Sequence, residues 1–123
     1  MKKTPLLYVD DEPINLKLFK LNFDKIFELH VAESGMEALK IIEENDISII
    51  ISDYKMPEMN GVEFIGEAKK RKDEFICFLL SAYKESELRS FTIESKNIDG
   101  YISKPWKRDD VLNLINKSLE VSS

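Results

Sequence analysis

Five side chains that could do chemistry each follow a run of apolar residues. They are Asp10, Asp11, Asp53, Ser81 and Lys104. The clearest run is Ile49-Ile50-Ile51, which leads through Ser52 into Asp53. Such a run, without polar alternation, is typical of a strand buried on both faces. In open parallel sheets, ligands bind at the C-terminal ends of the strands. We therefore expect these five side chains to share one edge of a sheet.

The chemistry open to this group is phosphoryl transfer. Carboxylates that lie close together repel, and their pKa values rise unless a cation sits among them. Oxygen donors without His or Cys suit a hard divalent ion such as Mg²⁺. A carboxylate beside Mg²⁺ can attack a phosphoryl group and form an aspartyl phosphate, whose oxygens Lys104 and the Ser81 hydroxyl can contact. No glycine-rich phosphate loop occurs, so the donor is expected to be another phosphorylated molecule and not bound ATP.

Each of these residues also has a plainer explanation when taken alone. Asp53 can cap the following turn, and Asp10-Asp11 can form the N-terminus of a helix. Ser81 can belong to a turn, and Lys104 can be a solvated cation. Their common position at one sheet edge favours a site. The only histidine, His30, falls in a different strand region, and we interpret it as a strand residue and not as a ligand.

The elements that must position these residues alternate between strand and helix. Strands are predicted over residues 6–9, 28–32, 47–52, 75–80 and 100–103. Helices are predicted from residue 13 to about 26, around 38–42 with an end at 45–46, around 62–72, roughly over 84–96, and around 111–119. In the first helix, Ile14, Leu18 and Leu21 recur at helical spacing and are expected to face the core, with Phe19 and Phe23 beside them. The alternation predicts an α/β fold of the flavodoxin-like, doubly wound kind, with a five-stranded parallel sheet in the order 2-1-3-4-5 and five helices.

Composition narrows the classes of function. The 123 residues suit a single domain, 1–123, with one core. A net charge of −5 argues against a nucleic-acid-binding surface. The single cysteine, Cys77, excludes an internal disulfide and favours a reducing, cytoplasmic location. No apolar stretch approaches transmembrane length, so no membrane association is expected.

Four segments together resemble the receiver domain of two-component response regulators. They match that family's motifs in order and spacing, and the resemblance covers essentially the whole chain. The segments are Val9-Asp10-Asp11-Glu12-Pro13, Ser52-Asp53-Tyr54-Lys55-Met56-Pro57-Glu58-Met59-Asn60-Gly61, Leu80-Ser81-Ala82 and Tyr101-Ile102-Ser103-Lys104-Pro105. Ser81 stands where threonine is commoner, which leaves the hydroxyl chemistry unchanged.

The resemblance implies a role for each acid. Asp53 is the implied phospho-acceptor and a Mg²⁺ ligand. Asp11 is the implied direct Mg²⁺ ligand, Asp10 supports the ion through water, and the backbone carbonyl of Lys55 completes the protein ligands.

The resemblance also implies a switch. Lys104 pairs with the phosphate, and the Lys104-Pro105 bond is expected to be cis. Ser81 is the implied switch hydroxyl, and Tyr101 is the aromatic that changes rotamer with it.

The resemblance further implies that the side chains of Lys55 and Tyr83 flank the path of the hydrolytic water, and neither is a ready general base at neutral pH. We therefore expect a phosphorylated state that is long-lived for its class.

The implied partner is a sensor histidine kinase or a phosphotransfer protein that carries phosphohistidine. Phosphorylation would alter the surface made by the fourth helix, the fifth strand and the fifth helix, and lead to homodimerisation or docking to another protein. Trp106 is similar to the residue found in receivers that precede catalytic output domains. The chain itself is not expected to be an enzyme beyond its own phosphorylation and slow dephosphorylation.

Two other readings fit the same residues less well. An aspartate-nucleophile phosphatase would carry a second Asp two residues after the nucleophile, whereas Glu12 and Pro13 stand two residues after Asp10 and Asp11. A receiver-like scaffold that is not phosphorylated would be expected to lack one of the acids or Lys104, whereas this chain retains them all.

Overall fold

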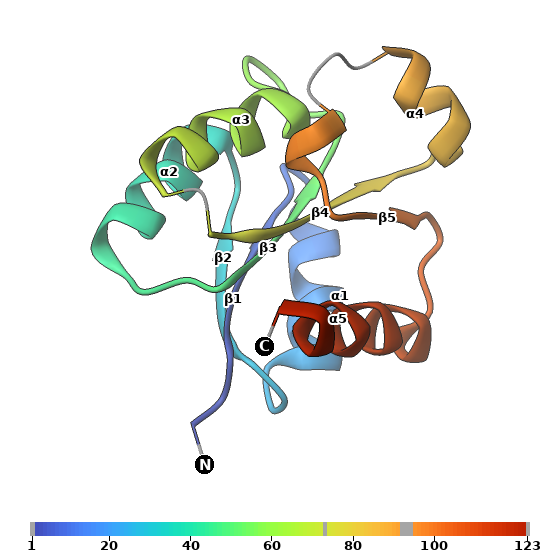
Figure 1. The fold of residues 1–123 in the computed structure, drawn as a ribbon. Helices are drawn as coiled ribbons and strands as arrows, with labels where there is room; N and C mark the ends of the chain where they lie inside the picture. The colour runs from blue at the N-terminus through green and yellow to red at the C-terminus, as the bar shows by residue number, and fades with distance from the viewer. Residues whose placement is uncertain (1, 73, 92–94, 123) are drawn as a thin grey trace.

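The computed structural model describes residues 2–72, 74–91 and 95–122, and in these residues strands and helices alternate (Figure 1). The strands are β1 (Pro5–Val9), β2 (Glu28–Ala32), β3 (Ile49–Asp53), β4 (Ile76–Ser81) and β5 (Gly100–Ser103). The helices are α1 (Pro13–Phe23), α2 (Gly35–Glu44), α3 (Gly61–Arg71), α4 (Glu85–Phe91) and α5 (Arg108–Ser122), with a 3₁₀ turn η1 (Ser95–Asn97) before β5. Among the described helices, none combines the length and apolar character needed to cross a membrane.

All five strands form one parallel sheet in the order β2-β1-β3-β4-β5, which confirms the predicted topology. The register aligns the C-terminal ends of the central strands. Val9 lies opposite Ser52, and Asp53 lies opposite Leu80. The residues that follow these positions therefore meet at one edge, as the sequence predicts for a doubly wound sheet.

The central strands β1, β3 and β4 are covered on both faces. Leu7, Ile50 and Cys77 belong to the core on the side of α2 and α3, while their neighbours along each strand belong to the core on the side of α1 and α5. Figure 1 shows these two helix pairs on opposite sides of the sheet. Burial on both faces explains why these strands read as unbroken apolar runs.

The buried face of α1 differs from the predicted one. Ile14, Leu18 and Leu21 are 66%, 48% and 75% exposed, so their assignment to the core is wrong. The helix buries its aromatic face, since Phe19 and Phe23 are both almost completely buried. The Phe19 ring stacks on Tyr8 with 4.0 Å between centroids and also contacts the ring of Trp106. Aromatic rings remove more apolar surface from water than aliphatic side chains, and this favours the observed rotation of the helix.

Some boundaries also differ from the predicted ones. Helix α1 ends at Phe23, three residues earlier than expected. The predicted fourth helix, 84–96, is α4 only to Phe91, and Ser95–Asn97 form a 3₁₀ turn. Residues 92–94 of that prediction lie outside the described residues. Strand β3 extends to Asp53, so the acid is the last residue of the strand itself.

The exposed and buried faces of α1 predict opposite outcomes for two truncations. Phe19→Ala should lower the free energy of unfolding by about 3–5 kcal/mol, because it removes a buried ring and leaves a cavity. Leu21→Ala should change it by less than about 0.5 kcal/mol, because that side chain lies in solvent. Urea denaturation followed by circular dichroism measures both. Equal losses for the two variants would contradict the observed orientation of α1.

Candidate functional site

Three carboxylates meet at the C-terminal edge of the sheet. One oxygen from each of Asp10, Asp11 and Asp53 lies within 4.8 Å of the others. Asp10 is fully buried, Asp53 is 4% exposed and Asp11 is partly buried. The loop after β1 supplies the first two acids, and the end of β3 supplies the third. The structure thus brings together the acids that the sequence predicts to be neighbours.

Asp10 is fixed in place by three hydrogen bonds. Its backbone N–H donates to the carbonyl of Ala32 at 3.1 Å, which extends the pairing of β1 with β2. Its Oδ1 accepts from the backbone N–H of Glu12 at 3.0 Å. Its Oδ2 accepts from the hydroxyl of Tyr8 at 2.7 Å. Both oxygens of this buried carboxylate are therefore hydrogen-bonded, as burial of a charge requires.

Lys104 reaches the acids from the end of β5. Its Nζ lies 2.7 Å from Oδ1 of Asp53. Its backbone N–H donates to the carbonyl of Ser81 at 2.9 Å, which ties the loop after β5 to the end of β4. The Lys104-Pro105 peptide bond is cis, as the sequence resemblance predicts. The lysine and the acid thus form a close ion pair with little access to solvent on the acid side.

The positive charge of Lys104 does not balance the negative charges of the three acids. Burial raises the pKa of Asp53 above its usual value, the hydrogen bond and charge of Lys104 lower it, and the charges of Asp10 and Asp11 raise it again. The net direction is upward. A second cation would therefore be favoured here, and a set of oxygen donors without nitrogen or sulfur fits a hard ion such as Mg²⁺.

The loop between Asp53 and α3 is held closely against the acid. The N–H of Gly61 donates to the carbonyl of Tyr54 at 2.8 Å, and a Cβ at Gly61 would lie 2.3 Å from the carbonyl oxygen of Asp53. Glycine is therefore required by the close approach of the backbone. Asn60 and Glu63 form a capping box that fixes the start of α3.

The loop after β4 joins Ser81 to two aromatic residues. The Ser81 hydroxyl accepts from the backbone N–H of Tyr83 at 2.9 Å. The Tyr83 ring meets the Tyr54 ring edge-on, with 6.1 Å between centroids. The side chain of Lys55, the other residue predicted to flank the acceptor, is exposed. In this conformation the Ser81 hydroxyl is thus engaged by its own loop.

Tyr101 lies in the middle of β5, opposite Leu79 of β4. Its side chain packs against the core on the side of α2 and α3, and its hydroxyl oxygen is buried. The aromatic side chain that the sequence singles out as part of a switch therefore points inward in this structure.

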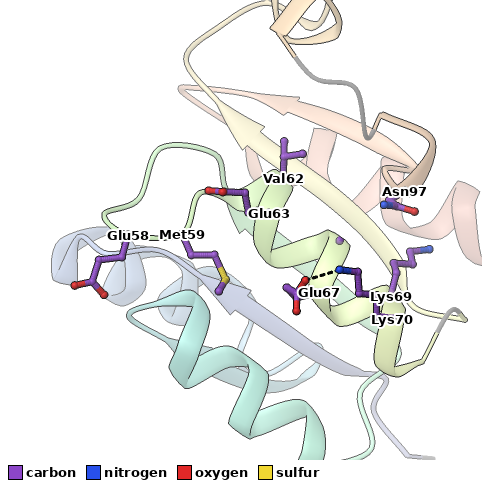
Figure 2. A pocket seen from close by; sticks show the side chains of 9 residues that line it. Glu58, Met59, Val62, Glu63, Glu67, Lys69, Lys70 and Asn97 are labelled. Carbon is purple, nitrogen blue, oxygen red and sulfur yellow. Dashed lines mark hydrogen bonds and ion pairs between the residues drawn. The ribbon is translucent and has the colours of Figure 1, made fainter.

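Two of the surface cavities in the described part of the chain differ in their relation to the site, and one of them is lined by Tyr8 and Lys104, which contact Asp10 and Asp53. It has a volume of about 650 Å³ and is lined by residues that include Leu18 of α1, Lys104 and Trp106. The other, of about 710 Å³, lies along α3, where Lys70 and Glu67 form an ion pair at 2.9 Å (Figure 2). None of the three acids lines either cavity, but Tyr8 and Lys104, which contact Asp10 and Asp53, line only the first, so that cavity is the one next to the candidate site.

The sequence analysis missed two contributors to the site. Tyr8 was assigned only to a strand, yet it binds Asp10. The signal was present, since residues two apart on a strand share a face. Tyr54 was not singled out, and no spacing rule indicates its ring contact with Tyr83, because the two residues come from different loops.

Comparisons with known proteins agree on one family. Residues 6–116 match the response regulator receiver domain. The hydrogenase transcriptional regulatory protein HoxA of Cupriavidus necator is 29% identical over 119 residues, which are 97% of this chain and 25% of HoxA. The chain spans about a quarter of the length of such curated relatives.

Solved structures show the same fold. The response regulator protein TrrA of Thermotoga maritima, solved in complex with Mg²⁺ and BeF, has a TM-score of 0.83 at 34% identity, and the match covers 93% of this chain and 97% of TrrA. The signal receiver domain of an HD domain-containing protein from Pseudomonas fluorescens Pf-5 has a TM-score of 0.87 at 22% identity, with 97% and 96% of the two chains covered.

The raised pKa of Asp53 predicts a pH-dependent effect of Asp53→Asn in metal-free protein. The folded state disfavours the ionised acid, so the stability of the parent is lost as pH rises through the raised pKa. The variant should therefore melt a few degrees higher at pH 7, and the difference should shrink below about pH 3.9, the ordinary pKa of Asp. Thermal denaturation in EDTA measures this.

A matched control is Asp46→Asn, because the Asp46 side chain is 92% exposed and lies before the start of β3, whereas Asp53 is at the end of that strand. It should leave the melting temperature unchanged across the same pH range. A melting temperature of Asp53→Asn equal to or below that of the parent at pH 7 would show that Lys104 fully compensates the buried charge.

Proposed function

Because this chain belongs to the response regulator receiver domain family, we propose that it accepts a phosphoryl group on Asp53 from a phosphohistidine of a partner protein. The reaction depends on Mg²⁺, and it changes the surface formed by α4, β5 and α5, which carries the signal onward. The partner is a sensor histidine kinase or a phosphotransfer protein, and the site of action is the cytoplasm.

One observation carries this proposal. The carboxylate of Asp53 has Lys104 at 2.7 Å on one oxygen and two further carboxylates within 4.8 Å. In the transfer, a carboxylate oxygen of Asp53 forms a bond to phosphorus while the bond from phosphorus to the histidine nitrogen of the donor breaks. Lys104 then stays beside the phosphoryl oxygens, since its ammonium is already placed at the acceptor.

The three acids and one backbone carbonyl are the proposed ligands of Mg²⁺. Asp11 and Asp53 would hold Mg²⁺ directly, Asp10 would support it through water, and the carbonyl of Lys55 would complete the protein ligands. When bound, the ion neutralises charge on the carboxylates and on the phosphoryl oxygens. The complex of TrrA with Mg²⁺ and BeF supports a magnesium site, because TrrA is 34% identical to this chain.

Incubation with acetyl phosphate and Mg²⁺ tests the acceptor. The parent should gain the mass of one phosphoryl group, and Asp53→Asn should gain none, because the nucleophile is lost. Intact-protein mass spectrometry measures the change, and Asp46→Asn is the matched control that should still be labelled. Absence of labelling in the parent would favour an unphosphorylated scaffold, and continuous hydrolysis of the reagent at a high rate would favour a phosphatase.

The output rests on Ser81 and Tyr101. In this structure the Ser81 hydroxyl accepts a hydrogen bond from the N–H of Tyr83 at 2.9 Å. Rotation of the hydroxyl toward the phosphoryl group would break that hydrogen bond. The loop leading into α4 would then shift, and Tyr101 packs against the same core as Leu88 of α4. A coupling free energy of about 1–3 kcal/mol is enough to shift such a population. Homodimerisation, a linked output domain or a separate target would read the change.

The donor is proposed to dock on the exposed face of α1. Ile14, Leu18 and Leu21 form one apolar stripe at spacings of four and three residues, which suits packing against a second helix. Leu18 and Lys104 line the same cavity, so the stripe reaches the lysine that contacts the acceptor. A helix that carries phosphohistidine and has an apolar face would fit both features.

Leu18→Asp tests this docking face. Transfer from a phosphohistidine donor should slow by at least about tenfold, because the charge disrupts an apolar helix contact. Labelling by acetyl phosphate should be unchanged, because that reagent needs no docking surface. Met36→Asp is the matched control, since Met36 is also exposed, at 65%, but lies on α2. The proposal is wrong if Leu18→Asp slows both reactions equally or neither.

Lys55 and Tyr83 are proposed to lengthen the life of the aspartyl phosphate. The Tyr83 ring contacts the ring of Tyr54, which directly follows β3, and this contact holds Tyr83 near the acceptor, where it can block water. Neither Lys55 nor Tyr83 is a ready general base for water at neutral pH. Tyr83→Ala combined with Lys55→Asn should therefore speed the loss of phosphate several-fold, as a barrier change of about 1 kcal/mol allows. The decay of purified phosphoprotein measures this, and an unchanged or slower decay would refute the assignment.

A further inference from the structure

Tyr8 is a buried ionisable residue that the phosphoryl transfer does not use. Its side chain is fully buried in β1, and its ring stacks on Phe19 with 4.0 Å between centroids and 5° between planes. Packing of this kind requires only the ring, so phenylalanine would serve the core equally well. The hydroxyl must therefore be explained by its hydrogen bond, which it donates to Oδ2 of Asp10 at 2.7 Å.

The hydroxyl acts as a fixed donor. A carboxylate oxygen accepts hydrogen bonds, so the hydroxyl of Tyr8 is the donor in this contact. Asp10 in turn is fully buried and has no bulk water to hydrogen-bond its charge. The N–H of Glu12 satisfies one carboxylate oxygen and Tyr8 satisfies the other. These two donors come from the loop and from the sheet, and together they set the orientation of the carboxylate.

From this geometry we propose that Tyr8 is a positioning residue for Mg²⁺, acting through Asp10. The inference rests on the proposed magnesium site and adds a residue to it. Without the hydroxyl, the carboxylate would keep only the hydrogen bond from the N–H of Glu12, and it would turn toward solvent to recover hydration. The orientation that serves the ion would then have to be restored on binding, which weakens the affinity.

Comparison of two variants with the parent protein separates this role from simple packing. Tyr8→Phe removes one oxygen atom and keeps the ring stack. Phe19→Leu weakens the stack and keeps the hydrogen bond from Tyr8 to Asp10. If Tyr8 acts through its hydroxyl, Mg²⁺ affinity should fall about tenfold in Tyr8→Phe and change less than about twofold in Phe19→Leu, even though Phe19→Leu loses more stability.

Calorimetric titration with MgCl₂ measures the affinities, and circular dichroism confirms that each variant is folded. Asp10→Asn completes a double-mutant cycle, in which Tyr8→Phe should cause no further loss once Asp10 has been changed. This cycle keeps the test decisive if the single variant is less stable. Equal affinity in Tyr8→Phe and the parent would overturn the inference and leave the magnesium site intact, as would equal losses in Tyr8→Phe and Phe19→Leu. A parent that does not bind Mg²⁺ would overturn the site itself.

Discussion

The buried charge of Asp53 is the constraint on which the rest of the structure depends. An ionised carboxylate is costly to bury, and two more carboxylates lie within 4.8 Å of it. Lys104, at 2.7 Å, offsets part of that cost. The pKa of Asp53 nevertheless stays above its usual value, so the site is electrostatically incomplete without a second cation. This imbalance gives the site its proposed affinity for Mg²⁺ and its proposed reactivity toward a phosphoryl group.

The sheet is what makes this arrangement possible. Strand β3 is buried on both faces and holds Asp53 as its final residue, while the parallel register brings the end of β1 beside it. Gly61 allows the following loop to close on the acid without a Cβ in the way. The hydrogen bond from the backbone N–H of Lys104 to the carbonyl of Ser81 positions the lysine. The end of β3 and the loops after β1 and β5 thus supply the charges, and Ser81 and Tyr101, the residues proposed to move, lie in β4 and β5.

The sequence predicted the sheet well because its signals were unambiguous. Three isoleucines before Asp53 have few alternatives to a doubly buried strand. The buried face of α1 was harder to predict, because Ile14, Leu18 and Leu21 form one apolar stripe at helical spacing while Phe19 and Phe23 form part of another. Periodicity alone cannot choose between two stripes. The choice depended on Tyr8 in β1 and on Trp106 beyond β5, which pack on the aromatic face.

The candidate site was predictable to the level of residue types and strand ends. Hydrogen bonds were harder to predict, because they depend on side-chain direction. Asp10 directly follows β1 and lies two residues after Tyr8, so their contact follows from extended-chain geometry once the strand is known. The contact of Tyr54 with Tyr83 joins two loops and has no counterpart in local pattern. The exposed stripe of α1, predicted as core, gains a proposed role as a docking face only after the structure places it in solvent.

The central claim is that Asp53, and no other residue, carries the phosphoryl group. Reduction of the phosphorylated protein with borohydride converts an acyl phosphate into an alcohol, and peptide mass spectrometry then locates the altered residue. We predict a single reduced position, at Asp53, that appears only when the phosphodonor and Mg²⁺ are both present. Reduction at Asp10 or Asp11, or modification of Ser81 that resists borohydride, would contradict the account.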